Sequence, residues 1–392
     1  MTGNQTLSVL SLTKSTGGLA HYNKMLCTGL DPLGFETFTL CLSDQAETYA
    51  EDLRQAGLQA GTAEMARYHI DPLSDARLFR HIRKLVGQLR PDVILGHGSK
   101  AGLLARAVGA IAGVPAVYAQ ASLPFITRVQ GRKAYLYRGL EFVARLFGGH
   151  IVTLTSGAKE ATVGHGLSAA SRVTVIPTGV ETQRFAPTGK RSEAIQHFDL
   201  DPERPVVGWA GRFERQKAPE HFLAAIASVV HDIGDAQFLM AGEGSQKAET
   251  VDLAAELGVA KNVRFVPWQT DVIRLLEAMD LFVMTSRWEG LPLSLLEAMA
   301  MGCVPVATRA DGIVDVIEQG KNGYLAAIGD HGAIAEAIVR LLKNEGERGA
   351  MSQAARERIQ RHFSRQQMLY QWQDLMVRLA RGRGTDRATV PA

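Results

Sequence analysis

Two glutamates, Glu289 and Glu297, stand eight positions apart in a segment that leads from an apolar run through a Gly-Leu-Pro turn into a helical pattern. We expect Glu289 in the turn, where it can face a ligand, and Glu297 in the first turn of the helix. Backbone N–H groups at a helix start bind diphosphate oxygens, and a nearby carboxylate can accept hydrogen bonds from both ribose hydroxyls. Ser294 and Glu297 also have the spacing of a capping box, which needs no ligand. Local spacing alone leaves both interpretations open.

Two cations, Arg212 and Lys217, stand five positions apart after an apolar run that ends in glycine. We therefore expect both in one loop at the end of a strand. An arginine fork and a lysine point charge can neutralise a leaving nucleoside diphosphate without a metal ion. Taken alone, such a pair is more often a solvated basic loop.

Two further positions follow predicted strands in the N-terminal half. Gly17 and Gly18 open a helix after the first strand, and the permissive backbone of glycine explains such a turn without a ligand. His97 comes just past the end of another strand, where a lone histidine is more often a turn or capping residue.

The sequence does not indicate a metal site or a hydrolase site. Asp199 and Asp201 have Asp-x-Asp spacing, but they follow a helical segment and precede a proline, which indicates a helix end and a turn. Cys27, Cys41 and Cys303 lie far apart in apolar contexts, unlike the ligands of a zinc or redox site. No histidine pair has metalloprotease spacing and no serine lies in a Gly-x-Ser-x-Gly elbow. We expect no metal and no cofactor.

Short β-rich runs alternate with longer amphipathic patterns along the whole chain, which predicts parallel sheets covered by helices. We expect one series of strands at 7–12, 37–42, 92–95, 116–119 and 150–155, and a second at 205–210, 236–241, 263–266, 281–285, 304–308 and 323–325. The predicted fold class is α/β, with two Rossmann-like doubly wound domains facing each other across a cleft. Ligands of such sheets bind beyond the carboxyl ends of the strands, where the charged pairs lie.

The 392 residues exceed what one hydrophobic core usually organises, so we expect two domains. The segment 177–205, rich in Pro, Gly, Thr and charge, contains the expected hinge. We predict an N-terminal domain over 1–187, a C-terminal domain over 188–365, a last helix over 366–380 and a disordered tail over 381–392.

The composition, 46% hydrophobic and 21% charged, is that of a folded globular protein, and a net charge of +3 does not indicate a nucleic-acid partner. The start of the chain lacks the pattern of a secretion signal, and no apolar run reaches the length of a membrane span. We expect a cytoplasmic protein whose membrane contact, if it has one, is peripheral.

The segment from 125 to 147 mixes basic and aromatic residues in a way that suits a membrane interface. Its cations are Arg128, Arg132, Lys133, Arg138 and Arg145. Leu136, Leu140, Val143 and Phe147 form a helical stripe that we expect to pack on the first sheet, which leaves the cations and aromatics for lipid.

Taken together, these segments resemble the family 4 glycosyltransferases of the GT-B type. The Arg-x4-Lys and Glu-x7-Glu motifs of that family match the two charged pairs, and its Ile-Pro-x-Gly-Val and Ala-Gly-x-Gly elements match 176–180 and 241–244. The match spans nearly the whole chain. One departure concerns a Gly-Gly-Ile turn of the family, whose first glycine is Asp311 here, which puts the identity of the sugar in doubt.

The resemblance implies transfer of a sugar with retention at the anomeric carbon, from a donor held by the C-terminal domain to an acceptor held by the N-terminal domain. It implies that His97 faces the transferred sugar and that the last helix crosses back to the N-terminal domain. We assign catalysis to Glu289, His97, Arg212 and Lys217, and donor binding to Gly17, Gly18, Arg212, Lys217, Gly290, Leu291, Pro292, Leu293 and Glu297.

The predicted function is that of a retaining hexosyltransferase that uses a nucleotide-diphosphate sugar as co-substrate. We expect a glycan or lipid-linked acceptor, a role in cell-surface polysaccharide or glycolipid synthesis, and a peripheral contact with an anionic membrane. Two alternatives remain: a nucleotide-sugar epimerase of the same architecture, which needs no acceptor, and a catalytically silent binding subunit, which has no need of the charged pairs.

Overall fold

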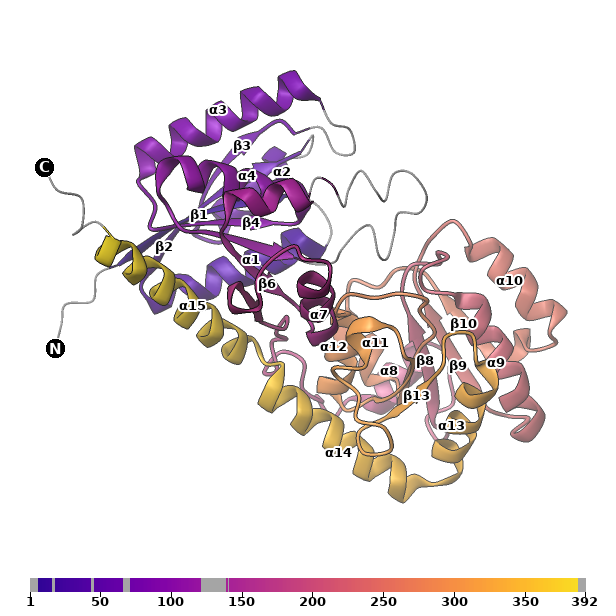
Figure 1. The fold of residues 1–392 in the computed structure, drawn as a ribbon. Coiled ribbons are helices and arrows are strands. Elements are labelled where there is room, and N and C mark those ends of the chain that lie inside the picture. Colours follow the sequence, from indigo (N-terminus) through magenta and orange to yellow (C-terminus); the bar gives the residue numbers. More distant parts are fainter. Residues whose placement is uncertain are drawn as a thin grey trace, which may run out of the picture. The chain divides into compact units, whose positions relative to one another are not determined.

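The computed structural model describes residues 6–15, 18–43, 46–65, 71–120, 139 and 141–386. The chain divides into two compact units (Figure 1). The first unit consists of Met1–Pro177 and Met368–Ala392, and the second unit consists of Thr178–Gln367. Among the described helices, none is both long and apolar enough to cross a membrane.

The first unit is built on a seven-stranded parallel sheet in the order β3-β2-β1-β4-β5-β6-β7. Its strands are β1 (Leu7–Lys14), β2 (Phe35–Leu42), β3 (Gln59–Ala63), β4 (Val93–His97), β5 (Ala116–Gln120), β6 (His150–Thr153) and β7 (Val173–Val175). Its helices and 3-10 turns include α1 (Gly18–Leu30), η1 (Asp31–Leu33), α2 (Ala46–Gln55), α3 (Pro72–Leu89), α4 (Ser99–Ala112), η2 (Arg145–Phe147), α7 (Ser156–Gly164) and η3 (Ala170–Arg172).

Both faces of this sheet are buried, because successive side chains of a strand point to opposite sides. Val9 of β1 packs in a cluster with Leu26 of α1, whereas Leu10 packs on the other face with Val108 of α4. The order of the strands reverses between β1 and β4, which makes their carboxyl ends the topological switch point of the first unit.

The second unit is built on a six-stranded parallel sheet in the order β10-β9-β8-β11-β12-β13. Its strands are β8 (Val206–Ala210), β9 (Gln237–Ala241), β10 (Val263–Val266), β11 (Leu281–Met284), β12 (Val304–Thr308) and β13 (Tyr324–Ala326). Its helices and 3-10 turns include α8 (Arg191–His197), α9 (Pro219–Asp232), α10 (Lys247–Glu256), η4 (Ala260–Asn262), α11 (Val272–Glu277), α12 (Leu293–Met301), η5 (Asp311–Ile313), α13 (His331–Lys343) and α14 (Glu345–His362). Here the switch point lies between β8 and β11. The prediction of two doubly wound parallel sheets is confirmed.

The last helix, α15 (Arg365–Asp386), packs on the first unit. Trp372 is fully buried there, and its indole N–H donates a hydrogen bond to the Tyr22 hydroxyl oxygen at 2.7 Å. Met368 and Leu375 share the same core cluster. The helix continues to Asp386, so the prediction of a disordered tail from residue 381 is wrong for 381–386, while 387–392 lie outside the described residues.

The boundary between the two units falls after Pro177, ten residues before the predicted end of the first domain at 187. Backbone pairing explains the difference. The Val180 N–H donates to the Phe363 carbonyl at 2.8 Å, and the Arg365 N–H donates to the Val180 carbonyl at 2.8 Å. These bonds hold the start of the segment 178–187 to the second unit.

Candidate active site

The two charged pairs lie in neighbouring loops of the second unit, because β8 and β11 are adjacent in the sheet. The Arg287 N–H donates to the Gln216 carbonyl at 2.8 Å. The Thr285 hydroxyl lies 3.0 Å from the Lys217 carbonyl oxygen and 2.9 Å from that of Ala218, and it can donate a hydrogen bond to either. The loop after β8 and the loop after β11 are thus tied together at the switch point, where open parallel sheets bind ligands.

Lys217 and Glu289 form an ion pair, with 2.6 Å between Nζ and Oε1. The exposed fractions of the two side chains are 15% and 6%, so the Glu289 carboxylate is nearly enclosed and Lys217 keeps a limited opening to solvent. The pair balances its own charge within the protein. A phosphate group that approaches this opening can accept a further hydrogen bond from the Lys217 ammonium, because that group has three N–H donors.

Arg212 is exposed, and its guanidinium is held by a glutamine that sequence reasoning missed. Arg212 Nη2 donates to Gln216 Oε1 at 3.3 Å. Gln216 Nε2 donates to the Trp288 carbonyl at 3.0 Å and lies 3.5 Å from Glu289 Oε2. One side chain therefore spans both loops. Its place directly before Lys217 in the sequence is the one signal that pointed to it.

The Ala-Gly-x-Gly motif after β9 serves close backbone packing. Gly242 and Gly244 have φ angles of +145° and +157°, which side chains of L-residues rarely allow. A Cβ atom on Gly242 would lie 1.9 Å from the Gly211 carbonyl oxygen. The Gly211 N–H donates to the Ala241 carbonyl at 3.0 Å, and the Phe213 N–H donates to that of Glu243 at 2.9 Å. The motif thus positions the loop that carries Arg212.

Helix α12 begins at Leu293, and no side chain caps its N-terminus. The capping box of Ser294 and Glu297 does not form, because Pro292 occupies the N-cap position. Glu297 is the fifth residue of the helix, so its placement in the first turn is also wrong. The uncapped N–H groups at this end can bind an anion. Of the residues before the helix, Leu291 and Pro292 are buried and Gly290, like Leu293, is half-buried.

Burial raises the pKa of the Glu297 carboxyl to about 7, and the positive charge of Arg184 opposes this rise. A glutamate with this pKa is partly protonated near neutral pH. Its carboxyl group can then accept a hydrogen bond from a ligand hydroxyl with one oxygen and donate one with the other.

His97 ends β4 at the switch point of the first unit, but its side chain is fully buried. Its Nε2 lies 3.2 Å from Asn23 Nδ2, and the Tyr22 ring meets its ring edge-on at 5.8 Å. Burial lowers the pKa of His97 to about 3, so the ring is neutral. Its Nδ1 has no partner among the described residues. The contact between His97 and the sugar stays a prediction. Gly18 is the first residue of α1 and has open space around it, while Gly17 lies outside the described residues.

The Asp-x-Asp pair lies in a turn beyond α8. Asp201 Oδ1 accepts a hydrogen bond from the Glu203 N–H at 2.9 Å, and Asp199 pairs with Arg264. Within the part of the chain that the structure describes, no group of three His, Cys, Asp or Glu side chains is placed to hold a metal ion. Asp311, which departs from the glycine of the family, is exposed in η5 after β12.

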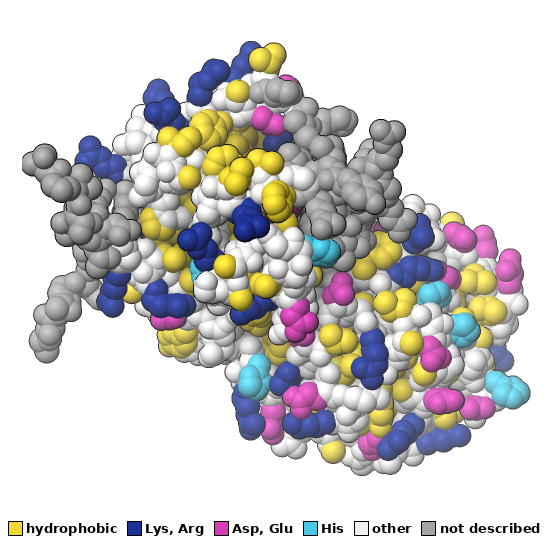
Figure 2. All heavy atoms as spheres, in the orientation of Figure 1, with side chains coloured by type: hydrophobic (Ala, Val, Ile, Leu, Met, Phe, Trp, Pro, Cys, Tyr) yellow, Lys and Arg dark blue, Asp and Glu magenta, His cyan; other side chains and the backbone are white. Residues whose placement is uncertain are grey.

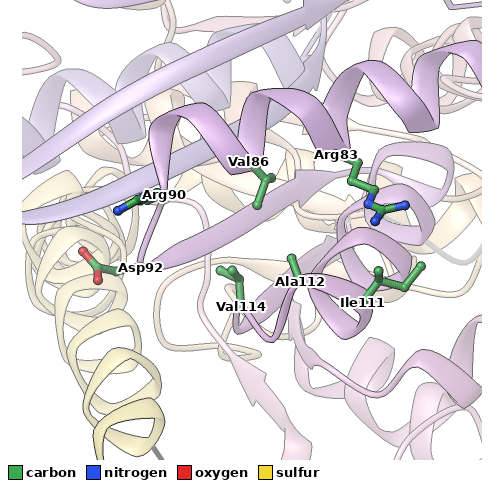
Figure 3. Close-up of a pocket in the computed structure, with 8 residues that line it drawn as sticks. Arg83, Val86, Arg90, Asp92, Ile111, Ala112 and Val114 are labelled. Carbon is green, nitrogen blue, oxygen red and sulfur yellow. The ribbon is translucent and has the colours of Figure 1, made fainter.

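A hollow of about 520 Å³ lies away from the switch point of the first unit, between the last turns of α3 and α4 (Figure 3). Arg83, Val86, Ile111 and Val114 are among the residues that line it. Asp92, which directly precedes β4, also lines the hollow, so the hollow lies at the amino-terminal ends of the strands. Open parallel sheets bind their ligands at the carboxyl ends of the strands, and we therefore do not place the active site in this hollow.

Comparison with known families covers both units. The model for glycosyl transferases group 1 matches residues 190–358, and the model for glycosyltransferase family 4 matches residues 16–184. The chain belongs to the family 4 glycosyltransferases. The motif regions of this glycosyltransferase that lie around Arg212, Lys217, Glu289 and Glu297 fall within the first of these two matches.

Two similar proteins are bacterial glycosyltransferases by name. This glycosyltransferase is 26% identical over 278 residues to the UDP-Gal:alpha-D-GlcNAc-diphosphoundecaprenol alpha-1,3-galactosyltransferase of Escherichia coli, covering 70% of this chain and 72% of that protein. It is 30% identical over 201 residues to the lipopolysaccharide core biosynthesis mannosyltransferase LpsB of Rhizobium meliloti, covering 50% and 57% of the two chains.

Solved structures show the same fold. The structure of Anabaena HepE in complex with UDP superposes with a TM-score of 0.83 at 17% identity, covering 95% of this chain and 99% of that chain. A glycosyltransferase from Rickettsia africae also has a TM-score of 0.83, at 16% identity. At these identities the likeness concerns the fold alone, which is the GT-B fold.

Proposed function

We propose that this glycosyltransferase moves a hexose from a nucleotide-diphosphate sugar to a glycan or lipid-linked acceptor, with retention at the anomeric carbon. We place the reaction in the synthesis of a cell-surface polysaccharide or glycolipid. The observation that carries the proposal is the cluster of Arg212, Lys217 and Glu289 in two tied loops at the switch point between β8 and β11.

Two kinds of comparison support the donor and acceptor classes. The Escherichia coli relative is described as using UDP-Gal and a diphosphoundecaprenol acceptor. The Anabaena structure contains UDP, and a further structure of the same protein contains UDP-glucose. We extend a nucleotide-diphosphate donor and a lipid-linked or polysaccharide acceptor to this chain on that basis.

In the proposed reaction the bond between the anomeric carbon and the phosphate oxygen breaks, and its electron pair leaves with the nucleoside diphosphate. Arg212, Lys217 and the uncapped end of α12 stabilise that growing negative charge. The acceptor hydroxyl oxygen bonds to the anomeric carbon on the face that the phosphate leaves, and its proton passes to the departing phosphate. The two cations take the role that a divalent metal has in other transferases, so we propose that no metal is required.

Glu289 is suited to orient the sugar rather than to attack it. Its Oε1 accepts a hydrogen bond from Lys217, whereas Oε2 has only a long contact with Gln216 and can accept a hydrogen bond from a sugar hydroxyl. Glu297, with its raised pKa, is suited to contact the ribose hydroxyls. We also assign His97 to the sugar, although its side chain is fully buried against Asn23 and Tyr22 in this structure.

The experiment that tests the function has two stages. A panel of nucleotide sugars is first screened for protection of the enzyme against thermal unfolding, because a ligand that binds only the folded state raises its stability. The donor found in this way is then incubated with lipid-linked and glycan acceptors, with and without chelator. The one-bond coupling constant between the anomeric carbon and its proton, measured by NMR, gives the anomeric configuration of the product.

We expect transfer in the presence of chelator and a product with the anomeric configuration of the donor. A product of opposite configuration contradicts retention. Loss of transfer in chelator that a divalent ion restores contradicts the role of the two cations. Conversion of the donor sugar without any acceptor identifies an epimerase, and absence of both donor binding and turnover identifies a silent subunit.

A further inference from the structure

A strongly exposed apolar group lies on the flank of the first unit, just before β6. Phe142, Val143 and Leu146 have exposed fractions of 52%, 50% and 79%. Residues 141–147 are helical or 3-10, and side chains three or four positions apart share one face of such a segment. Glu141 and Ala144 of the same segment are buried, so the segment is anchored by its inner face.

This exposure contradicts one expectation from the sequence. The stripe that includes Val143 and Phe147 was expected to pack against the first sheet, but Val143 is half exposed and Phe147 is only half-buried. The other two stripe positions, 136 and 140, lie outside the described residues, as do Arg128, Arg132 and Lys133. The apolar side chains on the described flank are therefore available to a partner.

Exposed arginines stand beside these apolar side chains. The Arg145 guanidinium lies 5.7 Å from the centre of the Phe142 ring, and its Nη1 donates to the Gly166 carbonyl at 3.1 Å. Arg172, exposed in η3, lines a small hollow of about 170 Å³ together with Arg145 and the buried Arg106. We call Phe142, Val143, Arg145, Leu146 and Arg172 the basic-apolar flank.

Acidic side chains are missing from this flank among the described residues. The carboxylate nearest in sequence, Glu141, is buried and accepts a hydrogen bond from the Tyr118 hydroxyl at 3.1 Å. Between Asp92 and Glu160 the sequence contains no other acidic residue, but it contains Lys100, Arg106, Arg128, Arg132, Lys133, Arg138, Arg145 and Lys159. Figure 2 shows hydrophobic and basic side chains side by side on the visible face of the first unit.

We propose that the basic-apolar flank docks on the surface of an anionic lipid bilayer. Apolar and aromatic side chains enter the boundary between headgroups and acyl chains, while the neighbouring arginines stay at the level of the anionic headgroups. This mode needs only a few apolar side chains. A stable protein interface needs far more apolar area, and a symmetric dimer through this flank would bring its arginines against their own copies.

The inference goes beyond the transfer reaction, since it assigns a second surface that contains no residue of the candidate active site. Its one connection with the proposed function is that docking on a membrane brings the enzyme to the surface where a lipid-linked acceptor lies. Vesicle binding is measured without donor or acceptor, so its failure leaves the transferase assignment intact, and failure of the transferase assignment leaves vesicle binding intact.

The test is co-sedimentation of the full chain with vesicles of phosphatidylcholine alone or of phosphatidylcholine with phosphatidylglycerol, at low and high salt. The apolar variant is Phe142→Ser with Val143→Ser and Leu146→Ser, and the charge variant is Arg145→Gln with Arg172→Gln. Leu73→Ser is the apolar control, because Leu73 is 74% exposed elsewhere in the first unit. Lys261→Gln with Arg274→Gln is the charge control, because both residues are exposed in the second unit.

We expect the parent to bind the anionic vesicles and to be released by high salt. Loss of two cations weakens binding about 25-fold, because each cation near an anionic surface contributes about fivefold. The apolar variant loses about tenfold or more, and both controls stay close to the parent. Circular dichroism and thermal unfolding confirm that each variant is folded.

Four results overturn the proposal: a parent that ignores anionic vesicles at low salt, equal binding to neutral vesicles, flank variants that bind like the parent, and controls that lose as much as the flank variants. Sedimentation velocity without vesicles can give a fifth result that overturns the proposal. A dimer that disappears in the apolar variant assigns the flank to a second copy of the chain instead.

Discussion

Replacing Lys217 by methionine removes the cation that neutralises Glu289 while keeping most of the side-chain volume. The Glu289 carboxylate is 6% exposed, and its other side-chain hydrogen-bond contact among the described residues is with Gln216, at a long 3.5 Å. Removing one partner of a buried ion pair costs about 3–5 kcal/mol. Because Lys217 is 15% exposed and water can replace part of its charge, we expect about 2–3 kcal/mol.

The double variant Lys217→Met with Glu289→Gln separates the ion pair from other effects of the substitution. It removes both charges, so we expect it to recover at least about 1 kcal/mol relative to the sum of the two single variants. The assay is urea unfolding followed by tryptophan fluorescence. Trp209, Trp268 and Trp288 belong to the second unit and only Trp372 to the first, so fluorescence reports mainly on the unit that contains the pair.

A Lys217→Met variant within about 0.5 kcal/mol of the parent, with additive single and double variants, refutes this reasoning. In that case the 2.6 Å contact contributes nothing to the stability of the fold. The stability measurement also guards the kinetic tests, because it shows how much of any lost turnover comes from unfolding.

Two further predictions concern the candidate active site. Burial raises the pKa of Glu297 from its ordinary value of 4.5 to about 7 in the folded protein, so the folded state binds the proton of this carboxyl more tightly than the unfolded state does. The resulting contribution to stability is full below pH 4.5 and is lost as the pH rises to about 7. Glu297→Gln should therefore flatten this part of a curve of unfolding free energy against pH, measured by urea unfolding. Gln216→Leu removes the link between Arg212 and the loop after β11, so kcat should fall by about tenfold or more with a small change in the KM for the donor. Gln216→Glu should restore the contact with Arg212, but its carboxylate should repel Glu289. An equal kcat in the parent and in Gln216→Leu contradicts a positioning role for Gln216.

In the first sheet, the sequence predicted the inner strands better than the two edge strands. Runs such as 37–42 and 304–308 are largely apolar, because both faces of a central parallel strand are buried. The edge strand β3 was missed, since Gln59–Ala63 has no buried residue and lacks large apolar residues. The other edge strand, β7, has only three residues, too few for a pattern to emerge.

The candidate site was predictable as motifs but not as contacts. Lys217 and Glu289 are 72 positions apart, and they meet because β8 pairs with β11 on one side as well as with β9, the next strand of the sequence, on the other. Local spacing likewise suggested a capping box at Ser294, which fails because Pro292 takes the N-cap position before it. The burial of His97 depends on Asn23 and Tyr22 of α1, and its own segment carries no sign of them.

In the proposed reaction, Arg212 stabilises the negative charge of the leaving diphosphate. Arg212 is exposed, so Arg212→Gln should leave the fold intact and a kinetic loss can be assigned to chemistry. The measurement is kcat/KM of the purified Arg212→Gln enzyme beside its affinity for the donor. Because the charge on the phosphate grows as the bond breaks, we predict that kcat/KM falls by about 100-fold or more while donor affinity falls much less. A kcat/KM within about threefold of the parent contradicts the central claim.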